Sequence, residues 1–347
     1  MRRARLMRAE SAGTLKHFWY SLRQSTQALS FASKVETDLQ SQNTDASITG
    51  DKKMSTSNWP SAPELRRDEI GFNFRGTEYL GHLVAPPESV GPRPLVLVIH
   101  NYQGLKFFDI DVAEYLARLG YVGLAIDMYG ELVPADQRTW PADASRIEAF
   151  QKTCFEGMVA CDHDFEFFRA LLAEWLEHGL SHSTVDSSVS AAAIGYCFGG
   201  IAVLEAVRGG LDLSGVVSFH GLLQTGEDGS PAMFGVERPP VKPCDNVYNT
   251  DTIVLIENGK DDQLVPDESK QRFYEEMDEA GVQWIFHDYS KTPHGFALPE
   301  SLGPPGHLHE DTDRRSTMSM LNLFREIFPG VPQNSVGHNA AGTSIPV

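Results

Sequence analysis

The sequence predicts a single α/β domain over residues 61–330, with a mostly parallel sheet flanked by helices on both faces. Three observations support this prediction. Short apolar runs alternate with amphipathic segments at helical spacing, the pattern of parallel strands joined by crossover helices. Several apolar runs are continuous, as expected of strands buried on both faces. No internal repeat interrupts the order, and 347 residues suit one such domain with tails.

The first elements follow in chain order. Two alternating apolar segments around Arg75 and Gly76 predict a β-hairpin. The continuous apolar run at residues 94–100 predicts a buried strand. Apolar residues then recur at helical spacing over residues 108–119, and Gly120 is a typical helix stop.

The alternation continues to residue 328. Further strands are predicted at residues 121–127, 191–195, 215–220, 252–259 and 283–289. Further helices are predicted at residues 160–180, 199–210, 267–281 and 317–328. Because the carboxyl ends of parallel strands meet at one edge of a sheet, functional side chains are expected in the loops that follow these strands.

The first 35 residues carry seven Lys or Arg and one acidic residue, Glu10, which gives a local charge of +6. An Arg-rich, Ser-rich start is typical of an organelle transit peptide, and a disordered leader is the alternative. Residues 1–60 are therefore predicted to precede the fold, and residues 331–347 to form a flexible tail. The expected localisation is cytoplasmic, or mitochondrial or another organelle if the leader is a transit peptide.

Charge and composition exclude several classes of protein. The formal net charge of -18 disfavours nucleic acid and anionic membranes as partners, because the average field repels phosphate. No apolar run reaches the length of about 18 residues that spans a bilayer. The four cysteines form neither a disulfide framework nor a Cys/His metal pattern. No metal or cofactor is predicted, and the expected partner is a small molecule, bound by a monomer or small homo-oligomer.

The segment AIGYCFGGI, residues 193–201, has the sequence of a nucleophile elbow. Cys197 lies between a predicted strand and a predicted helix, where Gly195 and Gly199 let the two elements cross closely. The nearby helix N-terminus favours thiolate over thiol. The backbone N–H of Phe198 is then expected to face the oxygen of an attacked carbonyl. The alternatives for Cys197 are a buried inert thiol and a redox-sensing thiol.

A base and an acid follow in the order that this chemistry requires. Asp261 and Asp262 lie just beyond the strand predicted at residues 252–259, and His294 lies beyond the strand predicted at 283–289. Each residue alone has an ordinary structural explanation. Cysteine, aspartate and histidine at three strand ends in this order indicate a Cys-His-Asp triad, with the choice between the two aspartates open.

The same segments resemble the dienelactone hydrolase family of the α/β-hydrolase superfamily over residues 65–330. The matching motifs are GYCFGG around Cys197, AIDMYG at 125–130, VVSFHG at 216–221, GKDDQLVP at 259–266 and HGFA at 294–297. The resemblance implies an α/β-hydrolase fold and an enzyme that cleaves a carboxylic ester or lactone through a thioester acyl-enzyme. It also implies Asp262 as the acid and the backbone N–H of Tyr102 as the second oxyanion-hole donor.

The sequence departs from the family pattern at two positions. Asn101 occupies the slot of a glutamate that helps to take the thiol proton, and an amide cannot accept a proton at neutral pH. His294 is therefore expected to take the proton itself, with Asn101 in the substrate pocket. Leu298 replaces an arginine that holds the substrate carboxylate, so a neutral or differently placed substrate is expected. The alternative function is a catalytically inactive domain that binds a ligand or a partner protein.

Smaller features lie near the same strand ends. Tyr129 follows the strand predicted at residues 121–127 and is expected to line the substrate pocket. His100 and His220 end two predicted strands and are interpreted as structural histidines with satisfied ring nitrogens. The Asp-His-Asp segment at residues 162–164 is interpreted as the acidic first turn of a helix rather than a metal site.

Overall fold

The described chain begins with a β-hairpin, β1 (Arg66–Phe74) and β2 (Thr77–Ala85), as the sequence predicts. Arg75 and Gly76 form its turn with φ angles of 50° and 90°, the positive values that a type I′ turn requires. The computed structural model describes residues 64–133 and 146–331. The predicted leader, and all but the first residue of the predicted tail, lie outside the described residues.

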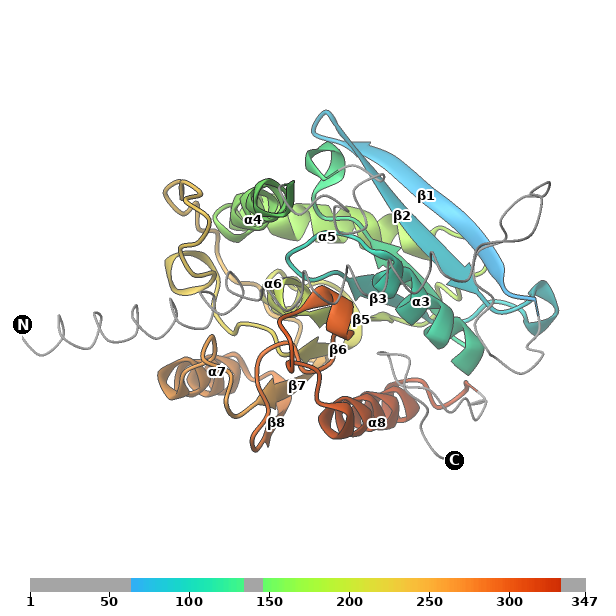
Figure 1. Cartoon of the computed structure of the whole chain (residues 1–347). Helices are drawn as coiled ribbons and strands as arrows, with labels where there is room; N and C mark the ends of the chain where they lie inside the picture. Colours follow the sequence, from blue (N-terminus) through green and yellow to red (C-terminus); the bar gives the residue numbers. More distant parts are fainter. Residues whose placement is uncertain (1–63, 134–145, 332–347) are drawn as a thin grey trace, which may run out of the picture. The chain divides into compact units, whose positions relative to one another are not determined.

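Within the described residues, eight strands form one sheet in the order β1-β2-β4-β3-β5-β6-β7-β8 (Figure 1). β2 pairs antiparallel with β4, whereas β4, β3, β5, β6, β7 and β8 run parallel. The remaining strands are β3 (Leu95–Ile99), β4 (Val122–Ile126), β5 (Ala191–Tyr196), β6 (Leu213–Phe219), β7 (Ile253–Gly259) and β8 (Gln283–Tyr289). The predicted strands and the mostly parallel sheet are confirmed.

Helices cover both faces of this sheet (Figure 1). The α-helices are α3 (Phe107–Leu119), α4 (Ile147–Asp162), α5 (Phe165–Leu180), α6 (Phe198–Arg208), α7 (Asp267–Ala280) and α8 (Glu310–Ile327). The short 3-10 helices are η1 (Glu88–Val90), η2 (Gly130–Leu132), η5 (Gly226–Asp228) and η6 (Glu300–Leu302). α3 and α8 lie on one face, where the rings of Tyr121 and Phe324 meet edge to face at 5.4 Å. α5, α6 and α7 cover the other face, and α4 packs on α5.

The helix predicted at residues 160–180 is confirmed as α5, but its predicted start is wrong, because residues 160–162 belong to α4 and α5 begins at Phe165. The Asp164 side chain accepts a hydrogen bond from the Phe167 N–H (3.1 Å) and caps the first turn of α5. The acidic-turn interpretation therefore holds for Asp164. Asp162 is instead fully buried and accepts a hydrogen bond from the Gly226 N–H (2.9 Å), which tethers a distant loop.

The last helix starts earlier than its apolar pattern indicates. α8 begins at Glu310, whereas the sequence predicts a start at Thr317. The side chain of His309 accepts a hydrogen bond from the Thr312 N–H (3.3 Å) and caps the helix. Acidic residues fill the first turn, where they interact favourably with the helix dipole.

Candidate active site

Cys197 lies at the turn between β5 and α6. Its φ of 56° and ψ of -106° form a strained conformation for a residue with a Cβ atom. A Cβ on Gly195 would lie 2.0 Å from the Gly199 carbonyl oxygen, and one on Gly199 would lie 2.2 Å from the Ile99 carbonyl oxygen. The strand and the helix can therefore cross at this distance only because both positions are glycine.

His294 and Asp262 meet at the same edge of the sheet. His294 Nδ1 lies 2.8 Å from Asp262 Oδ2, and Asp262 Oδ1 accepts a hydrogen bond from the Leu264 N–H (2.8 Å). The neighbouring Asp261 is exposed. Of the two aspartates that the strand-end pattern left open, Asp262 is the one beside the imidazole.

The Cys197 side chain also interacts with the His294 imidazole. Burial by itself lowers the pKa of His294, but the charges of Asp262 and Cys197, with a hydrogen bond to each, raise this pKa well above its usual value. Cys197, His294 and Asp262 are only 7%, 9% and 4% exposed, so little water screens these attractions. These attractions favour the protonated imidazole over the neutral one.

The loop after β3, residues 101–106 (the β3 loop), forms another side of the site. Asn101 is 2% exposed, and its Oδ1 accepts a hydrogen bond from the Gln103 N–H (2.8 Å). Its Nδ2 has no hydrogen-bond partner within the described residues, so the amide can offer donors to a bound molecule. Tyr102 interacts electrostatically with Cys197, and burial raises the pKa of Tyr102 to about 12. The structure thus places the β3 loop beside the thiol.

Tyr129 packs between the β3 loop and α6. Its hydroxyl donates a hydrogen bond to the Tyr102 carbonyl oxygen (3.0 Å), and its ring lies 5.5 Å from the ring of Phe198. Tyr129 is buried, with 5% of its surface exposed. It therefore supports the loop through its hydroxyl, a contact that the predicted pocket-lining role does not include.

The two strand-end histidines differ. His100 Nδ1 lies 2.7 Å from the Asn101 carbonyl oxygen, and its Nε2 accepts a hydrogen bond from the Met128 N–H (3.1 Å), so its predicted satisfied state is confirmed. The same prediction for His220 is wrong. Neither ring nitrogen of His220 has a hydrogen-bond partner in the described part of the chain. Its ring instead packs against those of His294 (5.1 Å) and Phe296 (5.3 Å), because aromatic side chains surround it.

Sequence reasoning missed two side chains that hold the Gln103 carbonyl oxygen of the β3 loop. Lys106 is buried, and its Nζ donates a hydrogen bond to the Gln103 carbonyl oxygen (2.6 Å). Cys154 Sγ donates to the same oxygen (3.3 Å) from α4, a helix that the sequence analysis did not predict. One signal points to Lys106: it is the N-cap of α3, and the dipole of a helix disfavours a cation at that end.

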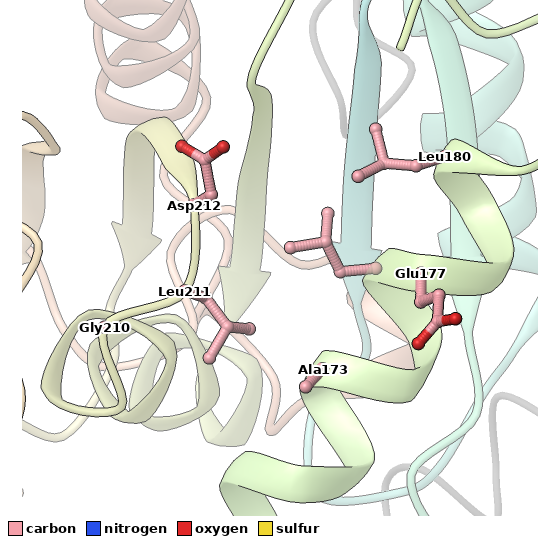
Figure 2. Close-up of a pocket in the computed structure, with 7 residues that line it drawn as sticks. Ala173, Glu177, Leu180, Gly210, Leu211 and Asp212 are labelled. Atoms are coloured by element: carbon pink, nitrogen blue, oxygen red, sulfur yellow. The ribbon is translucent and has the colours of Figure 1, made fainter.

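The structure also contains a hollow of about 430 Å³ between α5 and the turn before β6 (Figure 2). It is lined by Ala173, Leu176, Glu177, Leu180, Gly210, Leu211 and Asp212. Asp212 directly precedes β6, so this hollow lies at the amino edge of the parallel strands. Cys197, Asp262 and His294 follow the carboxyl ends of their strands, and the hollow is therefore separate from them.

Among residues 64–133 and 146–331, no group of three or more His, Cys, Asp or Glu side chains could hold a metal ion. No helix in these two ranges is long and apolar enough to cross a membrane.

Known proteins resemble this chain over most of its length. A model of the dienelactone hydrolase family matches residues 80–328. A probable 2-oxo-3-(5-oxofuran-2-ylidene)propanoate lactonase of a Bradyrhizobium species is 26% identical over 233 residues, which are 67% of this chain and 84% of that protein.

Solved structures give the same picture. A dienelactone hydrolase-like promiscuous phosphotriesterase from metagenomic libraries is 28% identical, with a TM-score of 0.58 over 76% of this chain and 98% of that one. A candidate dienelactone hydrolase from Klebsiella pneumoniae is 18% identical, with a TM-score of 0.53 over 76% of this chain and 99% of that one. At this identity, the second likeness concerns the fold alone.

Proposed function

The chain belongs to the dienelactone hydrolase family, has the α/β-hydrolase fold and is a carboxylic ester hydrolase, and we propose that Cys197, His294 and Asp262 carry out its reaction. One observation supports this most strongly. His294 Nδ1 lies 2.8 Å from Asp262 Oδ2, and the same imidazole interacts with the Cys197 side chain. A nucleophile, a base and an orienting acid are thus in contact in the order that acyl transfer requires.

In the first half of the proposed reaction, the Cys197 sulfur attacks the carbonyl carbon of an ester or lactone and forms a C–S bond. The carbonyl electron pair moves to the oxygen and gives a tetrahedral oxyanion. When the carbonyl re-forms, the C–O bond breaks, and the departing alkoxide takes the proton from His294. A thioester on Cys197 and a neutral imidazole remain.

In the second half, neutral His294 takes a proton from a water molecule whose oxygen attacks the thioester carbonyl. Collapse breaks the C–S bond, releases the carboxylic acid and restores the thiolate and the imidazolium. Asp262 keeps the imidazole in one orientation and stabilises its charge in both halves. His294 performs every proton transfer, because Asn101 cannot accept a proton.

The proposed oxyanion hole consists of the backbone N–H groups of Phe198 and Tyr102. Phe198 is the first residue of α6, so its N–H has no acceptor within the helix. Tyr102 lies in the β3 loop, beside the thiol. Each donor contributes about 3 kcal/mol to the stabilisation of a transition state of this kind.

We propose a small neutral ester or lactone as the substrate. Leu298 is buried and apolar, and its carbonyl oxygen is 2.9 Å from His307 Nε2. Because residue 298 is leucine, this position provides no cationic side chain to bind a substrate carboxylate. The unpartnered Nδ2 of Asn101 fits an acceptor oxygen of such a substrate. The related lactonase from Bradyrhizobium also supports a cyclic ester as a candidate.

The test is early quenching of the protein mixed with p-nitrophenyl acetate, followed by peptide mass spectrometry. An acetyl group is expected on the Cys197 peptide, and His294→Ala should lower p-nitrophenol release at least about a thousandfold. Cys244→Ala is the matched control, because Cys244 is the most exposed of the four cysteines and should not contribute. Full turnover by Cys197→Ala would contradict the assignment.

The alternative of a catalytically inactive binding domain rested on Asn101. No observation in the described residues favours it, because Cys197, His294 and Asp262 are in contact despite the amide.

A further inference from the structure

Hydrogen bonds fix consecutive peptide groups of the β3 loop. The Asn101 carbonyl oxygen contacts His100 Nδ1 (2.7 Å) and accepts from the Gly104 N–H (3.2 Å). In the next peptide, the Tyr102 carbonyl oxygen accepts from the Tyr129 hydroxyl (3.0 Å). The Tyr102 N–H belongs to the first of these peptides, so its direction depends on the contacts that fix the loop.

The third peptide of the loop is held by a buried cation. The Gln103 carbonyl oxygen accepts hydrogen bonds from Lys106 Nζ (2.6 Å) and Cys154 Sγ (3.3 Å). The N–H of the same peptide is that of Gly104, which donates back to Asn101. A contact that holds the Gln103 carbonyl therefore also restrains the Asn101–Tyr102 peptide, through the hydrogen bond from the Gly104 N–H to the Asn101 carbonyl oxygen.

Burial of Lys106 is costly unless its charge is compensated. The side chain is 2% exposed, and lysine is almost never found so deeply buried without partners. Its ammonium lies 4.7 Å from the centre of the Phe150 ring, at a distance that suits a cation–π contact. Its backbone N–H donates to Asp109 Oδ2 (2.7 Å), so α3 also holds the end of the loop. A charged donor gives a stronger hydrogen bond to the carbonyl than a neutral one.

We propose that Lys106 is a positioning residue for ester hydrolysis, because its hydrogen bond to Gln103 sets the direction of the Tyr102 N–H toward the oxyanion. This inference rests on the proposed function. Lys106 contacts no reacting atom; it acts through the β3 loop. Its loss should impair the step that develops negative charge on the carbonyl oxygen and leave the reactivity of the thiol itself intact.

Two reactions of Cys197 separate these effects. Turnover of p-nitrophenyl acetate forms an oxyanion, whereas alkylation by iodoacetamide displaces iodide and forms none. In Lys106→Met, which removes the donor and keeps the side-chain length, kcat should fall about tenfold to a hundredfold with little change in KM. The rate of Cys197 alkylation should stay within about twofold of wild type. Lys106→Gln, which retains an N–H donor, should recover part of the lost turnover.

Lys270→Met is the matched control. Lys270 is also buried, but its Nζ contacts Asp288 Oδ2 (2.9 Å) from α7, away from the β3 loop. This variant should lose stability as Lys106→Met does, and its kcat should be that of wild type.

Wild-type turnover in Lys106→Met would overturn the inference, and so would equal losses of turnover and alkylation, which indicate general distortion. If Lys106→Met does not fold, Lys106→Gln decides: a reduced kcat with normal alkylation supports the inference, and an unchanged kcat overturns it. A wild-type protein that forms no acyl-enzyme on Cys197 overturns the proposed function and this inference with it.

Discussion

A fully buried histidine directly follows each of β3 and β6, the two strands on either side of β5, yet the two sides of the elbow are stabilised differently. On the β3 side, His100 uses both ring nitrogens, and hydrogen bonds hold the β3 loop. On the β6 side, His220 has no hydrogen-bond partner in the described residues, and its ring packs among aromatic rings. It also has a positive φ of 42°, an unfavourable conformation for a side chain of this size.

The difference indicates which side of the site depends on polar contacts. Burial, together with the nearby His294 and His307, lowers the pKa of His220 well below its usual value, so this ring is neutral. A neutral ring without hydrogen bonds can be replaced by an apolar ring of similar shape. Replacement of His100 instead leaves buried partners without hydrogen bonds, and such groups are destabilising.

The largest expected effect is a difference in reactivity between two buried thiols, those of Cys197 and Cys154. Cys154 belongs to the β3 side, and burial raises its pKa to about 12. Iodoacetamide at neutral pH should therefore label Cys197 at least about a hundredfold faster than Cys154, measured by peptide mass spectrometry over time. In urea-unfolded protein, both should react at similar rates. Equal labelling in the folded state would show that the β3 side opens readily.

His100→Phe should destabilise the protein by about 2–4 kcal/mol, measured by urea unfolding. The substitution leaves the Met128 N–H without its acceptor and removes one donor from the Asn101 carbonyl. Because the latter carbonyl shares a peptide with the Tyr102 N–H, kcat should also fall at least about tenfold. If the free energy of unfolding falls by less than about 1 kcal/mol, the claim that polar contacts stabilise the β3 side is contradicted.

Asp109 makes the β3 side dependent on pH. Burial raises the pKa of this carboxyl from 3.8 to about 7, although it accepts a hydrogen bond from the Lys106 N–H. The folded protein therefore binds this proton more tightly than the unfolded chain. The stability that it contributes is complete below pH 3.8 and is lost as pH rises through about 7, with a slope of up to about 1.4 kcal/mol per pH unit.

Asp109→Asn should remove this slope between pH 4 and 7, which thermal unfolding at several pH values can measure. Asp186→Asn is the control, because hydrogen bonds from Ser188 lower the pKa of that exposed carboxyl, out of this range. An Asp109→Asn variant with the wild-type slope would contradict the raised pKa.

The smallest effect is expected for His220→Phe. No hydrogen bond is lost, and the ring contacts with His294 and Phe296 can be kept, so stability should change by less than about 1 kcal/mol. The activity should stay within about threefold of wild type. A loss as large as that of His100→Phe would show that the β6 side also depends on a polar contact.

Much of the fold could be predicted because its signals are local. The hairpin turn at Arg75 and Gly76, the buried strands and the elbow glycines each follow from a short pattern with a clear physical meaning. α4 could not be predicted in this way. It contains Gly157, a poor helix former, whose missing side chain makes room for the Tyr129 ring: a Cβ there would lie 2.8 Å from that ring.

The sequence by itself determined the parallel α/β architecture and the strand ends at which Cys197, His294 and an aspartate lie, because these depend on hydrophobic period and on residue order along the chain. The family resemblance selected Asp262 over its neighbour, but only the tertiary structure placed its carboxylate beside His294 and brought Lys106 and Cys154 to one carbonyl oxygen. The tertiary structure also decided that His100 is hydrogen-bonded and His220 is not. Such contacts join segments far apart in the chain, and no local pattern encodes how near those segments come after folding.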